Sequence, residues 1–155
     1  MKADVALPIT GRCYCGATTV RATSAPQVVA YCHCTDCRRV TGAPVSAWGA
    51  FDESDLVFTP GEGRIASPNP GVSRSFCASC GSSLACRYDY LPGQVYVAIG
   101  ILDQAAELAP EVHAHFAQRL PWLNIYDAAD RFAGTSRSRL HGAPRLSRHQ
   151  EMTCK

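Results

Sequence analysis

The chain has 155 residues, of which 46% are hydrophobic and 18% are charged, and its formal net charge is +2. This length and composition indicate one folded domain that can bury a core. No stretch approaches the ~20 apolar residues of a membrane helix, and Met1 to Asp4 lack the apolar core of a secretory signal, so we expect a cytoplasmic protein.

Short extended segments separated by turn residues follow one another along the chain. Their β-branched and aromatic content predicts strands at Ala17–Thr23, Gln27–Tyr31, Val45–Phe51, Leu56–Thr59, Val72–Phe76, Ser83–Tyr88, Gln94–Ile99 and Val112–Phe116. Proline and glycine predict turns between them at residues 60–61, 67–71 and 92–93. Helix is scarce, with single turns predicted at Thr35–Val40, capped by Thr35, and at Asp103–Leu108. The sequence therefore predicts a mainly β domain over residues 3–133.

A basic tail is predicted from residue 134 to residue 155. It carries five basic side chains against the single acid Glu151, which gives it a formal charge of +4 and leaves −2 for residues 1–133. The tail has no apolar periodicity, so we expect it to be flexible and solvated. The mildly acidic body argues against a dedicated nucleic-acid-binding module.

Nine cysteines are the most unusual feature of the sequence. An odd number without an export signal argues against a disulfide framework, and closely spaced cysteines in a reducing compartment are more often metal ligands or redox pairs. Cys13-Tyr14-Cys15-Gly16 and Cys77-Ala78-Ser79-Cys80-Gly81 each place two sulfurs beside a turn that glycine permits. Two such pairs, far apart in sequence, make a four-thiolate structural zinc site.

The middle cluster, Cys32-His33-Cys34-Thr35-Asp36-Cys37, offers three sulfurs from one loop. Three protein ligands and an open fourth position are the pattern of catalytic zinc. Either His33 or Cys86 could instead occupy the fourth position and make the site structural. We expect the side chain of His33, which lies between two ligands, to point away from the ion, and Cys86 to be a small buried hydrophobic residue.

Two other chemistries remain open for these cysteines. A Cys-x-x-Cys pair also serves thioredoxin-like redox enzymes, but that chemistry belongs to a βαβ context that is not predicted here. Iron is possible in a four-cysteine site, because thiolates select weakly between zinc and iron.

The sequence resembles the glutathione-dependent formaldehyde-activating enzyme (GFA) family, which includes the centromere protein V group. Residues 11–16, 32–38 and 74–82 carry the resemblance in order, together with residues 97–103 and the segment that contains Pro110, His113 and Pro121-Trp122. The resemblance implies an Mss4-like fold of antiparallel β-sheets stapled by zinc. It also implies two zinc ions: a structural one on Cys13, Cys15, Cys77 and Cys80, and a catalytic one on Cys32, Cys34 and Cys37.

The resemblance further implies a carbon–sulfur lyase that joins glutathione and formaldehyde, or separates them in reverse. Arg38 and Arg39 follow the third ligand of the second cluster and could meet a carboxylate of glutathione, although a solvated turn explains them equally well. Trp48, Phe51 and Trp122 could form the wall of a pocket or belong to the core. At Ala114-His115 the family usually carries bulkier apolar residues, so a substrate other than glutathione is an open alternative if this segment lines the pocket.

A zinc-stapled binding module without catalysis is the competing hypothesis, because a fold does not fix a function. The fourth position of the second zinc distinguishes the two hypotheses, since a protein ligand there favours a module and an open position favours an enzyme. We expect a small-molecule thiol or aldehyde as the partner. The sequence does not indicate which oligomeric state the protein adopts.

Overall fold

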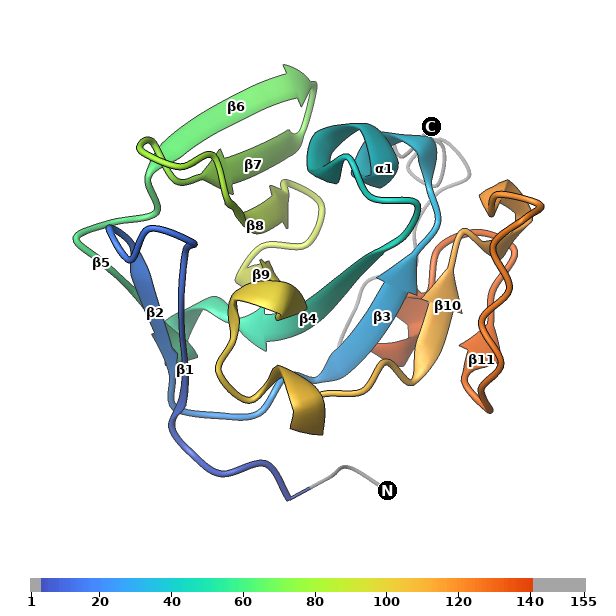
Figure 1. Ribbon diagram of the computed structural model, residues 1–155, viewed down its shortest axis with the longest axis horizontal. Helices are drawn as coiled ribbons and strands as arrows, with labels where there is room; N and C mark the ends of the chain where they lie inside the picture. Colours follow the sequence, from blue (N-terminus) through green and yellow to red (C-terminus); the bar gives the residue numbers. More distant parts are fainter. Residues whose placement is uncertain (1–3, 141–155) are drawn as a thin grey trace.

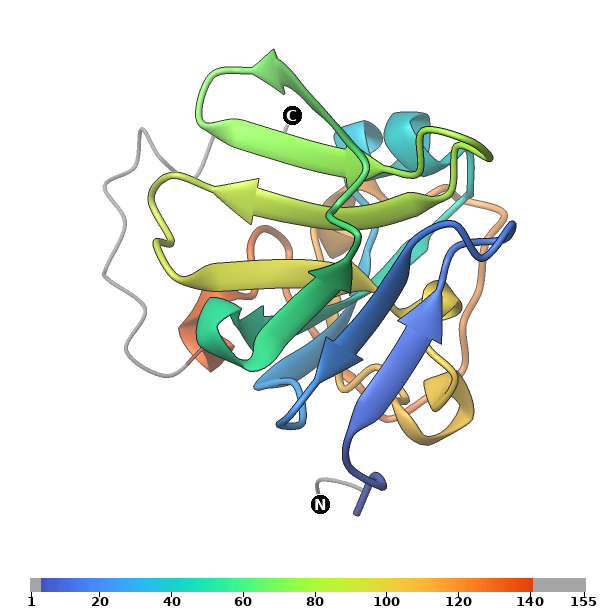
Figure 2. The same ribbon diagram turned by 90° about the vertical axis from the view of Figure 1, so that its left-hand side faces the viewer.

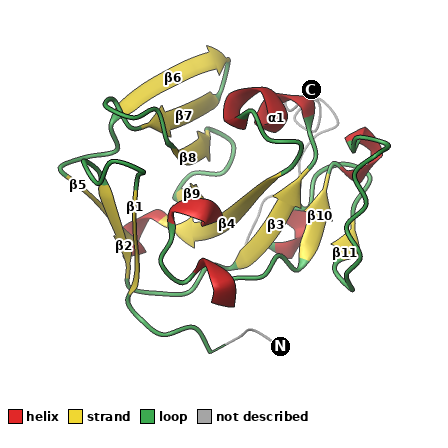
Figure 3. Ribbon diagram, in the orientation of Figure 1, coloured by secondary structure: helices red, strands yellow, loops and turns green. Residues whose placement is uncertain are grey.

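The computed structural model describes residues 4–140 and shows a mainly β protein with one α-helix in that range (Figure 3). A small sheet contains β1 (Ile9–Arg12), β2 (Thr19–Ala22) and β5 (Leu56–Thr59). A large sheet contains β3 (Val28–Cys32), β4 (Ser46–Asp52), β6 (Arg64–Asn69), β7 (Val72–Phe76), β8 (Ser83–Tyr88), β9 (Gln94–Ala98), β10 (Val112–Ala114) and β11 (Asp130–Arg131). Figure 1 shows both sheets, with α1 just beyond the end of β3.

The strand order is β1-β2-β5 in the small sheet and β11-β10-β3-β4-β9-β8-β7-β6 in the large one. Figure 2 shows the consecutive strands β6 to β9, coloured green to yellow, beside one another. All strand pairs are antiparallel except those of β10, which lies parallel to both β3 and β11. The expected mainly β fold of antiparallel sheets is confirmed, with β10 as the exception, because a long connection brings Val112–Ala114 back beside β3 in the same direction.

All eight predicted strands are confirmed, with small shifts at their ends. Three strands were missed: β1, β6 and the short β11. The end of β6 runs through a Pro-rich stretch that predicts a turn, and its register shifts between Ala66 and Asn69. Because β6 is the edge strand of the large sheet, the missing N–H of Pro68 need not interrupt a ladder on both sides.

The predicted helical turns are present but differ in detail. The helix α1 (Thr35–Thr41) is capped by Cys34, not by Thr35, because the Cys34 Sγ accepts a hydrogen bond from the backbone N–H of Cys37. Gly42 ends it in the left-handed conformation. The second predicted turn is the 3₁₀ helix η3 (Ala105–Glu107), and further 3₁₀ turns are η1 (Glu53–Asp55), η2 (Ile99–Ile101), η4 (Phe116–Gln118) and η5 (Arg137–Arg139). None of the helices within residues 4–140 is long and apolar enough to cross a membrane.

The main core lies between the small sheet and the large one. Its buried members are Ile9, Val20, Ala22, Val29, Phe51, Ala85, Val95, Val97, Ile99, Leu102 and Leu108. Strand β1 approaches the end of η2 closely at Gly11, where an added Cβ would lie 2.4 Å from the carbonyl oxygen of Ile101. Only glycine fits this approach, which sets the position of the turn that follows β1.

The first residues of the predicted tail pack onto the domain. The N–H of His115 donates to the carbonyl of Gly134 at 2.6 Å, and Leu140 is buried beside Val112 and Ala30. The structure therefore places residues 134–140 against the domain. The rest of the predicted tail, with Cys154, lies outside the described residues.

Candidate functional site

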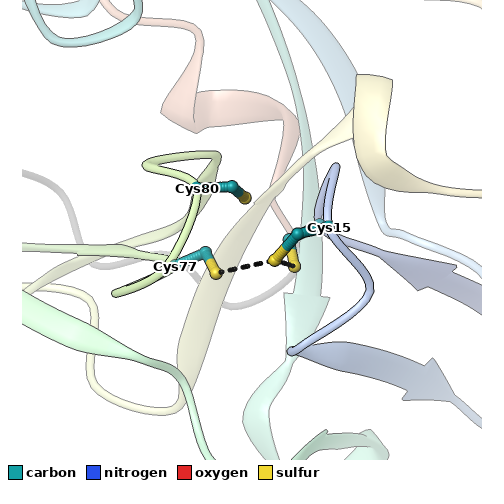
Figure 4. A group of neighbouring side chains, drawn as sticks. Cys15, Cys77 and Cys80 are labelled. Carbon is teal, nitrogen blue, oxygen red and sulfur yellow. Dashed lines mark hydrogen bonds between the residues drawn. The ribbon is translucent and has the colours of Figure 1, made fainter.

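The two outer cysteine pairs meet in space as one cluster. The sulfurs of Cys13, Cys15, Cys77 and Cys80 all lie within 4.8 Å of one another. Figure 4 shows Cys15, Cys77 and Cys80 pointing toward a common centre from two turns. The sulfurs of Cys13 and Cys15 are 3.6 Å apart, and those of Cys15 and Cys77 are 3.8 Å apart. A tetrahedron with zinc–sulfur distances of 2.3 Å has edges of about 3.8 Å, so the cluster fits zinc.

The backbone around this cluster holds the sulfurs in place. The N–H of Thr18 donates to the Cys13 Sγ at 3.3 Å, and hydrogen bonds from Ser82 lower the pKa of Cys80 to about 5. Gly16 and Gly81 follow the second cysteine of each pair with positive φ, which lets both turns close. The first turn follows β1 and the second joins β7 to β8, so a metal here would tie the small sheet to the large one.

The middle cysteines form a second, deeper cluster. The sulfurs of Cys32, Cys34 and Cys37 lie within 4.8 Å of one another, and all three residues are buried. Cys32 ends β3, whereas Cys34 caps α1 and Cys37 lies in its first turn. Its neighbours Cys34 and Cys37 raise the pKa of Cys32 well above its ordinary value, because three adjacent sulfurs cannot all ionise without a nearby cation. The donor set therefore fits a thiolate-binding metal ion.

No fourth His, Cys, Asp or Glu among residues 4–140 joins this cluster. Cys86 is buried in β8 and burial raises its pKa to about 11, in keeping with a small hydrophobic residue. His33 instead bonds through its Nε2 to the Nδ1 of His113 at 2.9 Å. Neither residue therefore belongs to the group of donor atoms that lie within 4.8 Å of one another.

A buried chain of side chains holds His33 away from the cysteines. The Nε2 of His113 lies 3.0 Å from a carboxylate oxygen of Asp127. Because that carboxylate accepts, His113 carries its proton on Nε2, and its Nδ1 accepts from the Nε2–H of His33. Burial is the main cause that lowers the pKa of His33 to about 4, so His33 is neutral. The loop between Cys32 and Cys34 is thereby fixed to β10.

A pocket opens against the three-cysteine cluster. It encloses about 540 Å³, its open mouth included. Cys32 and Cys37 form part of its wall and Cys34 does not. The remaining lining residues are Ala30, Trp48, Arg74, Cys86, Tyr88, Tyr96, Ala114, His115, Thr135, Ser136 and Arg137. Two of the three cysteines of the cluster thus belong to the wall of this cavity.

The residues that the sequence suggested for a pocket wall lie in different environments. Trp48 lines the pocket, Phe51 is fully buried in the main core and Trp122 is 64% exposed. Ala114 and His115 both line the pocket, and His115 adopts a left-handed conformation with φ of 53°. Burial lowers the pKa of His115. The segment that departs from the family pattern is therefore part of the cavity wall.

Arg38 is held away from the pocket. Its Nη1 donates to the carbonyl oxygens of His33 and Gln118 at 2.7 Å and 2.6 Å, and it is not among the lining residues. Arg39 is exposed on α1. The two arginines that the sequence suggested are thus not brought to the cavity.

The buried arginine of the pocket is Arg74, which sequence reasoning missed as a site residue. It lies on β7 opposite Cys86, is 5% exposed, and places its Nη2 and Nη1 at 3.9 Å and 4.0 Å from the Cys37 Sγ. Burial alone would lower the pKa of Arg74, but the sulfurs of Cys86 and Cys37 raise it above its ordinary value. Arg74 lies two residues after the buried Val72 in a short strand, so both side chains face the same side of the sheet. That spacing was the sequence signal for a buried Arg74.

Comparison with known proteins places this site in a family. A family model described as glutathione-dependent formaldehyde-activating enzyme matches residues 8–118, which include both cysteine clusters. A crystal structure of a Rhodobacter sphaeroides protein, a target of Northeast Structural Genomics, aligns with a TM-score of 0.52 and 23% identity, covering 61% of this chain and 87% of that one. That likeness shows a shared fold. No curated protein matched the chain.

Proposed function

The chain belongs to the glutathione-dependent formaldehyde-activating enzyme family, and we propose that it is a zinc-dependent carbon–sulfur lyase. Its substrate in this proposal is the adduct of a glutathione-like thiol and a small aldehyde such as formaldehyde. One observation carries the proposal: the three-cysteine cluster has no fourth protein ligand among the described residues and faces a pocket. Three ligands and an accessible position are the pattern of catalytic zinc. The four-cysteine cluster then holds a structural zinc.

Zinc at the three-cysteine cluster would supply thiol activation or polarisation of an aldehyde oxygen. In the synthetic direction the thiol sulfur forms a bond to the carbonyl carbon, and the thiol proton ends on the carbonyl oxygen. The reverse direction breaks that carbon–sulfur bond and returns both reactants. No redox partner is required in either direction.

The lining residues suit this reaction. Trp48, Tyr88 and Tyr96 limit the access of water, which strengthens electrostatic interactions inside the cavity. Neutral His115 can accept a hydrogen bond or a proton from a substrate group. Among residues 4–140 the lining includes Arg74 and Arg137 and no carboxylate, so the pocket favours an anionic form of the substrate. The reduced thiols that the proposal needs fit a cytoplasmic location.

Exchange spectroscopy by NMR tests the proposal. The zinc-loaded protein should speed the interconversion of formaldehyde, glutathione and their adduct without moving the equilibrium. Cys34→Ser should abolish this acceleration, because it removes a metal ligand that is not part of the pocket wall. Arg39→Ala, an exposed change on the same helix, should retain it. An unchanged exchange rate with fully zinc-loaded protein would reject this chemistry and favour a non-catalytic binding module.

A further inference from the structure

Arg74 is a buried cation in an unusual setting. It is 5% exposed, and no ion pair with a carboxylate is found for it within residues 4–140. The contacts that its guanidinium makes there are to the sulfur of Cys37. A buried charge without a counter-ion is strongly destabilising, so this arginine needs a negative charge nearby.

The three-cysteine cluster can supply that charge once it binds a divalent ion. Three thiolates outnumber the charges of such an ion by one, so the loaded cluster carries a net negative charge. Arg74, which contacts Cys37 from a different element, balances that charge. The cysteines come from β3 and α1 whereas Arg74 comes from β7, so the fold alone brings them together.

We propose that Arg74 makes the three-cysteine site selective for an anionic ligand over a neutral one. With Arg74 present, an incoming anion meets a cluster whose charge is already balanced. Without it, the anion would meet a net negative charge in a site that solvent screens poorly. The affinity for a neutral ligand depends much less on whether Arg74 is present. This inference rests on the proposed function, because it assumes a metal ion on Cys32, Cys34 and Cys37.

Arg74 acts here as a specificity residue for that function. A thiol that reacts from this pocket binds as its anion. A site that prefers anionic ligands therefore prefers thiols to neutral donors. The Arg74 nitrogens at 3.9–4.0 Å from Cys37 Sγ place the charge beside the cluster. For an anion about 6–12 Å from the guanidinium, one charge alters affinity by about 10- to 100-fold at an effective dielectric constant of about 20.

Cobalt-substituted full-length protein provides the test. Cobalt bound by thiolates absorbs visible light, and the spectrum of a three-thiolate centre changes when a fourth ligand binds. Titration with azide, an anion, and imidazole, a neutral donor, gives the ratio of the two affinities. Arg74→Met should lower the azide-to-imidazole ratio by about tenfold or more. Arg39→Met, which removes an exposed charge two residues from Cys37, should change it by less than about twofold.

Further variants keep the test decisive if Arg74→Met does not fold. Arg74→Lys keeps the charge and should retain most of the anion preference, whereas Arg74→Gln should lose it. An unchanged ratio in the neutral variants overturns the role of Arg74 but leaves the lyase proposal to the exchange assay. If wild-type cobalt protein shows no spectral change with either ligand, the accessible position is absent and both proposals fail.

Discussion

The stability of the Cys77→Ser variant should show whether Cys77 is a ligand of a structural metal ion or an ordinary buried thiol. Cys77 is 1% exposed and belongs to the cluster that joins the turn after β1 to the turn between β7 and β8. Structural zinc contributes about 10 kcal/mol or more in zinc-finger peptides, whereas a whole domain is stable by only about 5–15 kcal/mol. Losing one of four ligands should therefore cost several kcal/mol, enough to leave much of the variant unfolded.

Cys86→Ser is the matched control for this prediction. Cys86 is 2% exposed and lies in neither cluster, so the same chemical change there should cost only about 1–3 kcal/mol. Urea unfolding followed by circular dichroism, with elemental analysis for zinc, measures both variants and the effect of a chelator on the wild type. Equal unfolding midpoints for the two variants, or a wild-type midpoint that the chelator does not move, would refute the structural role of the four-cysteine site.

Two further predictions concern the surroundings of the second cluster. Arg38→Ala should lower the free energy of unfolding by about 1–3 kcal/mol, because it removes the hydrogen bonds to the carbonyls of His33 and Gln118. The free energy of glutathione binding, measured by calorimetry, should change less. A large loss of affinity with unchanged stability would contradict this prediction. Burial opposes ionisation of Asp127, but hydrogen bonds from His113 and Ala129 lower its pKa, so its contribution to stability is present above pH ~4 and disappears as pH falls through the lowered value. The difference in unfolding midpoint between wild type and Asp127→Asn should therefore shrink below pH ~4, and a difference that stays constant would argue against this stabilising role of the ionised Asp127 carboxylate.

The local features of the fold could be predicted from the sequence. The spacing of Cys32, Cys34 and Cys37 puts three sulfurs on one loop whatever the rest of the chain does, and the structure brings them together. The strands from β7 to β9 follow from their β-branched and aromatic content and from clear turn residues between them. These signals lie within a few residues of one another, so no tertiary information is needed to recognise them.

The missed features depend on contacts between distant segments. The cap of α1 is a cysteine sulfur, which propensity rules for Ser, Thr and Asp do not include. The edge position of β6 is what tolerates Pro68, and an edge cannot be recognised before the sheet order is known. Arg74 becomes a site residue only because β7 carries it to Cys37, so its meaning lies in the pairing of strands and not in the local pattern.

The parallel strand β10 has a consequence for how the chain reaches its native state during synthesis. It fills the space between β3 and β11, and the His33–His113 bond that it completes joins residues 80 apart in sequence. The loop with Cys32, Cys34 and Cys37 leaves the ribosome long before β10 does, and contacts of such separation form slowly. We therefore expect the nascent chain to present all three cysteines of this cluster before β10 pairs with β3. Metal binding at the cluster would then precede the pairing of these two strands.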